Sequence, residues 1–259
     1  MIDRAIAGLM LAGALAAVSR RTRSLSTGGA VAAVAVGLAA TLAGWGWAVL
    51  LIAFFVASTA LSRYRRAARD ARIGDIVEKG DERDAAQVLA NGGVFAVSVL
   101  ASAITGDPNW AAMALGALAA ATADTWATEI GTLAGRSPRS IISFQVVEPG
   151  TSGGVTVPGT LASAAGAAFI GAAALATGVA GDATPVIVGG LAGSFADSLL
   201  GATVQERRWC DRCSRFTERP VHSCGHPTRV TRGIPGLRND LVNVLCTLVG
   251  GAVALTIAR

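Results

Sequence analysis

The sequence is poor in aromatic and charged residues. Aromatic residues make up 5% of the 259 residues, with a single tyrosine, and charged residues make up only 15%. Lys79 is the only lysine, so nearly all the basic charge comes from arginine. No basic stripe is interleaved with aromatic residues, which argues against a nucleic-acid-binding surface. The net charge of +5 instead indicates loop charges that orient a membrane protein.

Cysteine is also scarce, and its placement excludes a secreted disulfide framework. Three of the four cysteines share one basic loop, and the fourth, Cys246, lies in an apolar run. The apolar run Ala5 to Val18 is followed by three arginines and preceded only by Arg4, the reverse of a signal peptide. We therefore expect this run to be a first membrane-spanning helix.

Apolar runs of membrane length recur along the chain. Hydrophobic residues make up 52% of the sequence, and 32 glycines favour close packing between helices. The sequence predicts an all-α, polytopic integral membrane bundle that forms a single transmembrane domain over 1–259. The expected spans, about eight, are 3–19, 27–44, 46–62, 84–104, 109–131, 155–178, 184–204 and 239–257.

Basic residues alternate between the connections of these spans. The loops 20–26, 63–83, 132–154 and 205–238 hold three, seven, two and eight lysines or arginines, together 20 of the 22 in the chain. The intervening turns hold none. The positive-inside rule predicts that all four loops are cytoplasmic and both termini are outside.

Polar residues gather at the span ends that adjoin the basic loops. These clusters are Asp84, Gln87 and Asn91; Asp124, Thr125, Thr128 and Glu129; Ser194, Asp197, Ser198, Gly201 and Gln205; and Asn239, Asp240 and Asn243. Carboxylates in membrane helices usually face a protein interior or a polar cavity. We expect one polar site near the cytoplasmic interface rather than a channel through the membrane.

The carboxylates of this site suit a magnesium ion. Asp124 and Asp197 are the expected Mg²⁺ ligands, and Glu129 and Asp240 are the other expected catalytic carboxylates, because Mg²⁺ takes one or two carboxylates together with substrate phosphates. The alternative is that these residues cap helix ends or pair with loop arginines.

A glycine-rich turn precedes the span 155–178 and suits phosphate, because exposed amides and a helix N-terminus meet there. It is not a P-loop, since no Gly-Lys-Ser/Thr follows, and a flexible turn is the alternative. The expected substrate- and nucleotide-binding residues are Arg83, Gln87, Asn91, Thr128, Arg139, Gly150, Thr151, Ser152, Gly153, Gly154, Thr156, Ser198, Gln205, Asn239 and Asn243. Arg136 is a further phosphate candidate. The arginines at 63, 65, 66, 69 and 72 form either a membrane anchor or a phosphate-attracting mouth.

The loop 205–238 carries a metal-binding spacing. Cys210, Cys213, His222 and Cys224 match a tetrahedral Cys₃His zinc site, with His226 as a spare ligand. Four protein ligands leave no open position, so the zinc would be structural and would hold a small zinc-binding insert in a loop with few apolar residues. Reduced surface thiols are the alternative.

Five stretches of the chain resemble a membrane family of once-unknown function that includes plant phytyl-phosphate kinase and animal transmembrane protein 19. The resemblance rests on 83–93, 123–131, 149–156, 197–202 and 239–243, together with the Cys/His loop. The family is distantly similar to CTP-using polyprenol kinases and phosphatidate cytidylyltransferases. The resemblance implies an enzyme that converts phytyl phosphate or a related isoprenyl phosphate to its diphosphate.

Residues and resemblance together predict a Mg²⁺-dependent membrane lipid kinase. It would transfer phosphate from a nucleoside triphosphate, with CTP a candidate, to an isoprenyl monophosphate such as phytyl or geranylgeranyl phosphate. The alternatives are a cytidylyltransferase that makes a CDP-lipid, and a transporter or flippase for phosphorylated lipids. The expected partners are the bilayer, the lipid phosphate and the nucleotide, without nucleic acid, and a homo-oligomer is a further candidate. The expected location is a prokaryotic inner membrane.

Overall fold

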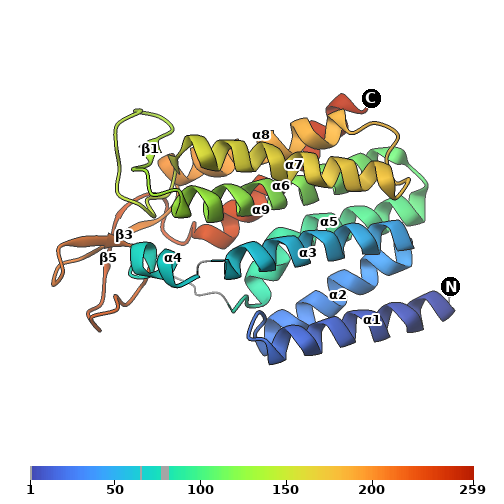
Figure 1. The fold of residues 1–259 in the computed structure, drawn as a ribbon, viewed down its shortest axis with the longest axis horizontal. Coiled ribbons are helices and arrows are strands. Elements are labelled where there is room, and N and C mark those ends of the chain that lie inside the picture. The colour runs from blue at the N-terminus through green and yellow to red at the C-terminus, as the bar shows by residue number, and fades with distance from the viewer. Residues whose placement is uncertain (1, 65, 77–81) are drawn as a thin grey trace.

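The computed structural model describes residues 2–64, 66–76 and 82–259, which form a bundle of antiparallel helices (Figure 1). The described residues include eight long helices: α1 (Ile2–Arg21), α2 (Thr27–Ala43), α3 (Trp45–Arg63), α5 (Ala85–Thr105), α6 (Pro108–Leu133), α7 (Val157–Ala176), α8 (Thr184–Thr203) and α9 (Asn239–Ile257). Both termini lie at one end of the bundle, and the basic connections gather at the other, here termed the loop end (Figure 1). The expected all-α membrane bundle is confirmed.

The membrane-crossing character differs among these helices. Within the described ranges, α1, α3, α5, α7, α8 and α9 are long and apolar enough to cross a membrane, while the apolar α2 has 17 residues. Helix α6 does not reach the same apolarity, although the sequence predicts a span there. It occupies the centre of the bundle, packed against α5, α7, α8 and α9, so its polar residues face protein rather than lipid.

Local signals set the helix ends. Ser26 accepts a hydrogen bond from the Gly29 N–H and caps α2, and Thr156 caps α7 in the same way through the Gly159 N–H. Gly44 separates α2 from α3 with a φ of 151°, which a side chain would hinder, so the chain turns tightly there. The expected spans and the observed helices therefore end within about two residues of each other.

Small residues allow the helices around α6 to approach closely. A Cβ atom at Gly116 would lie 2.4 Å from the Cβ of Ala254, and one at Gly250 would lie 2.5 Å from the Cβ of Ala120. This contact holds α6 and α9 at a backbone-to-backbone separation typical of small-residue interfaces in membranes. The polar ends of the helices are thereby brought together.

The loop end contains structure that the sequence analysis did not predict. Helix α4 (Arg66–Ile73) follows α3, and β1 (Arg139–Ser140) pairs with β2 (Gly154–Val155). The segment 205–238 forms a three-stranded antiparallel sheet in the order β4-β3-β5, made of β3 (Arg207–Cys210), β4 (Arg215–Thr217) and β5 (Arg229–Arg232). This sheet docks on the segment after α4, where the N–H of Glu218, the residue after β4, donates to the Ile76 carbonyl at 2.8 Å.

Candidate functional site

A polar cavity of about 350 Å³ lies at the loop end. Its walls come from the seven helices α3 to α9, the glycine-rich turn and Glu218, the residue after β4. The predicted site residues that line it are Arg83, Gln87, Asp124, Thr128, Glu129, Gly150, Thr151, Ser152, Gly153, Gly154, Thr156, Asp197, Ser198, Gln205, Asn239 and Asp240. The structure thus brings together residues that lie more than 150 positions apart in the chain.

Two carboxyl groups face each other inside this cavity. Asp124 of α6 and Asp197 of α8 are close enough to share a hydrogen bond. Oδ1 of Asp197 is buried and has no hydrogen-bond partner among the described residues. A positive charge between two such carboxyl groups would offset their mutual repulsion. Their oxygens fit the donor set of a divalent cation such as Mg²⁺.

Helix capping does not account for these two aspartates. Asp124 lies well inside α6 (Pro108–Leu133), and Asp197 lies well inside α8 (Thr184–Thr203). Asp240 differs, because it lies in the first turn of α9, where a carboxylate also complements the helix dipole. The helix end therefore offers a structural reason for the carboxylate of Asp240 but not for those of Asp124 and Asp197.

Glu129 is engaged by an arginine rather than directed at the aspartate pair. Its carboxylate accepts two hydrogen bonds from Nη1 of Arg69, at 2.8 and 3.0 Å, and one from the Ser62 hydroxyl at 2.7 Å. Both side chains of the ion pair are nearly buried. The pair ties α4 to α6 at the rim of the cavity, so Glu129 holds Arg69 in place there.

The glycine-rich turn packs tightly against the end of α8. Gly150 and Gly153 have φ values of 82° and 77°, which other residues rarely adopt. The Ser152 hydroxyl donates to Oε1 of Glu218 at 2.9 Å, and Nε2 of Gln205 donates to the same oxygen at 2.9 Å. Glu218 therefore fixes the turn from the side of the β4 strand.

We expect Gly153→Ala to destabilise the protein and impair the site. The added Cβ would lie 2.4 Å from the Cβ of Ala202, and the positive φ would cost about 1–2 kcal/mol in addition. Gly178→Ala is the matched control, because Gly178 also has a positive φ but has open space around it. Thermal melts and ligand binding of both variants test this. Equal behaviour of the two variants would show that the turn tolerates displacement.

Arg83 lies at the inner edge of the cavity. Its guanidinium donates to the hydroxyls of Thr59 and Ser62 at 3.4 and 3.3 Å, and it forms no ion pair among the described residues. Burial lowers the pKa of Arg83 from its ordinary value, and the nearby Glu129 charge opposes that effect. An arginine remains charged under all ordinary conditions. Two long bonds to neutral hydroxyls leave its fork of donors available to an anion.

Three predicted binding residues lie outside the polar cavity. Arg139 is exposed and donates to the Phe144 carbonyl at 2.8 Å, so it holds its own loop. Asn243 is buried on α9. Asn91 donates to the Gln87 carbonyl at 3.0 Å and lines an adjoining, mainly apolar cavity.

Other polar residues also line the cavity: Ser62, Arg69, Thr125, Thr132, Arg136, Thr160, Ser163, Ser194 and Glu218. Thr125 and Ser194 belong to the predicted polar clusters, Arg136 is the further phosphate candidate, and Arg69 belongs to the basic cluster at 63–72. The remaining five were not singled out from the sequence. The Ser163 hydroxyl is buried and lacks a partner within the described part of the chain, which adds to the unmet polar demand of the site. The helical stripe that contains Asp197 also contains Ser194, but no sequence signal points to Glu218. Of the basic cluster at 63–72, Arg65 lies outside the described residues.

A second constellation lies in the docked sheet. Cys210, Cys213, His222 and Cys224 place their ligand atoms within 4.8 Å of one another, the only such group of three or more ligands in the described ranges. Nε2 of His222 is buried and lacks a hydrogen-bond partner there, while His226 is not part of the group. Hydrogen bonds with His222 and the His226 backbone lower the pKa of Cys224 to about 6. These donors and their spacing fit a tetrahedral zinc ion.

Fold and site together define a multi-pass membrane protein with a carboxylate-lined cavity at one end of its helix bundle. The chain belongs to the family described as integral membrane protein DUF92, which matches residues 10–251.

Three curated relatives are similar over most of their length. The chain is 31% identical to the uncharacterized membrane protein MJ0933 of Methanocaldococcus jannaschii, over 98% of this chain and 94% of that protein. It is 30% identical to Protein PGR of Arabidopsis thaliana, over 95% and 93%. It is 28% identical to the uncharacterized membrane protein sll0875 of Synechocystis, over 83% and 74%. No solved structure matches the chain.

Proposed function

We propose that this protein is a membrane lipid kinase that phosphorylates an isoprenyl monophosphate, such as phytyl or geranylgeranyl phosphate, to the diphosphate. The observation that carries the proposal is the facing pair Asp124 and Asp197 in a polar cavity that is also lined by the glycine-rich turn and by Arg83. This set offers ligands for a cation and two separate places for phosphate. The resemblance noted from the sequence supports the same chemistry and suggests CTP as the nucleotide.

The residues divide the work of phosphoryl transfer between them. An oxygen of the lipid phosphate attacks the γ-phosphorus of the nucleotide, and the bond from that phosphorus to the β–γ bridging oxygen breaks, which releases a nucleoside diphosphate. Asp124 and Asp197 would hold Mg²⁺, which neutralises charge on the transferred group. Arg83 orients the lipid phosphate, and the amides of the turn 150–154 receive nucleotide phosphates. The lipid phosphate is itself the nucleophile, so the protein supplies positioning and charge.

Product analysis tests the reaction. Purified protein is incubated with isoprenyl monophosphates and each nucleoside triphosphate, and products are identified by mass. The proposal predicts a lipid diphosphate and a nucleoside diphosphate. A CDP-lipid with pyrophosphate would identify a cytidylyltransferase instead, and lipid-phosphate movement across vesicles without nucleotide turnover would identify a transporter.

The orientation that we propose places the site at the cytoplasmic face of a prokaryotic inner membrane. It rests on the basic residues, which concentrate at the loop end. In intact cells, a membrane-impermeant maleimide should label an Asp182→Cys variant, which lies in the turn before α8, but not a Ser143→Cys variant in the loop after β1. Both positions are exposed on the protein. Labelling of the parent protein, which keeps its four native cysteines, gives the background. Labelling of Ser143→Cys alone would reverse the orientation.

A further inference from the structure

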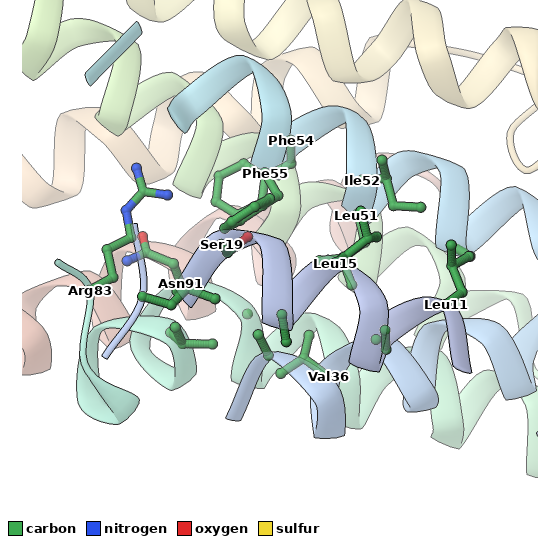
Figure 2. Close-up of a pocket in the computed structure, with 18 of the residues that line it drawn as sticks. Leu11, Leu15, Ser19, Val36, Leu51, Ile52, Phe54, Phe55, Arg83 and Asn91 are labelled. Carbon is green, nitrogen blue, oxygen red and sulfur yellow. The ribbon is translucent and has the colours of Figure 1, made fainter. Parts of the chain in front are cut away.

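A second cavity runs into the bundle between α1, α2, α3 and α5. It has a volume of about 120 Å³ and is lined mainly by apolar side chains. Figure 2 shows Arg83 and Asn91 at one end and Leu11 and Ile52 toward the other. Its lining on α2 extends as far as Thr41, about 20 Å from the start of that helix at 1.5 Å per residue. A small volume spread over such a length is a narrow channel.

This channel meets the polar cavity. Arg83, Gln87 and Thr125 line both. The backbone of Arg83 is held there by two hydrogen bonds with the segment before α2: its N–H donates to the Ser24 carbonyl, and its carbonyl accepts from the Ser26 N–H. A Cβ atom at Gly29 would lie 2.1 Å from that carbonyl, so α2 begins directly against Arg83. A charged group therefore marks the junction of an apolar channel and a polar chamber.

We propose that the channel holds the hydrocarbon chain of the lipid monophosphate, with its phosphate at Arg83. The headgroup identity rests on the proposed function. Arg83 has no ion pair among the described residues, and two oxygens of a phosphate match its donor fork. A linear hydrocarbon chain fits the shape of a narrow channel. Membrane lipid is as apolar as the channel wall, so the channel selects chain length and shape rather than adding hydrophobic affinity.

The architecture also provides access from the bilayer. Helix α1 packs chiefly against α2 and lies at the edge of the bundle (Figure 1). Residues of both α1 and α3 line the channel. Leu15 of α1 and Leu51 of α3 project into the space between these helices (Figure 2). A lipid chain can pass between α1 and α3 without leaving the membrane, while its phosphate stays at the loop end.

Binding measurements on two matched pairs of variants test the channel. Ala33→Phe narrows it about 9 Å from the start of α2, and Ala12→Phe narrows it about 14 Å from the end of α1. Ala35→Phe and Ala14→Phe carry the same change on the exposed faces of the same helices. The probes are isoprenyl monophosphates of two and four isoprene units, the four-unit alcohol, and inorganic phosphate, with binding followed by native mass spectrometry.

We expect Ala33→Phe to weaken binding of the four-unit monophosphate at least tenfold, and Ala12→Phe to weaken it while sparing the two-unit compound. Inorganic phosphate should bind all variants alike, and the alcohol should bind the wild type more weakly than the monophosphate. If thermal melts show that the Ala33→Phe variant is unfolded, the smaller substitution Ala33→Leu is used in its place. The proposal is contradicted if the channel variant and the exposed-face variant of each pair bind the four-unit monophosphate equally. It is also contradicted if the wild type does not bind that compound.

Product analysis on the same purified variants distinguishes a failure of the channel proposal from a failure of the proposed kinase reaction. If the narrowing substitutions selectively weaken binding but no diphosphate product forms, the channel proposal is supported and the kinase proposal is contradicted. If diphosphate forms and the narrowing substitutions leave its rate unchanged for all chain lengths, the kinase proposal is supported and the channel proposal is contradicted.

Discussion

Asp124→Asn and Asp197→Asn should each lower lipid-phosphate turnover by about 10²–10³-fold, the usual value of one electrostatic group aimed at developing charge. Both changes are nearly isosteric and remove one negative charge from a facing, buried pair. Their folded proteins should therefore melt at or above the wild-type temperature, since the substitution relieves repulsion between the two groups. Phosphoryl-transfer assays beside thermal melts measure both effects.

The double variant Asp124→Asn/Asp197→Asn gives the sharper result. If both groups hold one ion, the double variant should be little worse than the weaker single variant, because groups that act as a unit are not additive. Asp182→Asn, at the opposite end of the bundle, is the matched control and should retain turnover. Turnover near wild type in one single variant would remove that residue from the site, and in both it would remove the cation model.

The sequence could predict the position of the site because membrane helices constrain the chain strongly. Long apolar runs define the helices, and their alternation places Asp84, Asp124, Asp197 and Asp240 at one end of the bundle. Once the ends meet, any polar residue within the last turns has few places to point other than a shared cavity. The helix bundle and the end at which the polar cavity lies could therefore be predicted from the lengths of the apolar runs and the charge pattern.

The partners of those residues could not be predicted in the same way. A helical stripe gives the face on which Glu129 or Asn91 lies but not the neighbour it meets. Glu129 contacts Arg69 of α4, a helix that no apolar periodicity predicted. Asn91 lines the apolar channel. Glu218 reaches the glycine-rich turn only because a small sheet docks on the segment after α4, a contact between positions more than 60 apart. Long-range contacts of this kind have no local sequence signal.

The second large effect that we expect is the loss of a structural zinc ion from the docked sheet. The protein purified without chelator should contain about one Zn²⁺ per chain, held by Cys210, Cys213, His222 and Cys224, and Cys210→Ser should reduce the content to near zero. Structural zinc supplies folding energy outright, and the sheet has few buried apolar residues to replace it. Loss of zinc should therefore open the segment 205–238 to protease. Metal analysis and limited proteolysis measure these outcomes.

Loss of zinc should also reach the polar cavity, because the sheet carries Glu218. That carboxylate accepts hydrogen bonds from Ser152 and Gln205, so a disordered sheet would release the glycine-rich turn. Glu218→Gln separates the two roles: it should keep zinc and protease resistance but weaken nucleotide binding. Cys246→Ala, on α9 and outside the cluster, should change neither. Zinc-free wild-type protein with a protease-resistant sheet would contradict the metal site. A Cys210→Ser variant that loses zinc but binds nucleotide normally would contradict the link to the cavity.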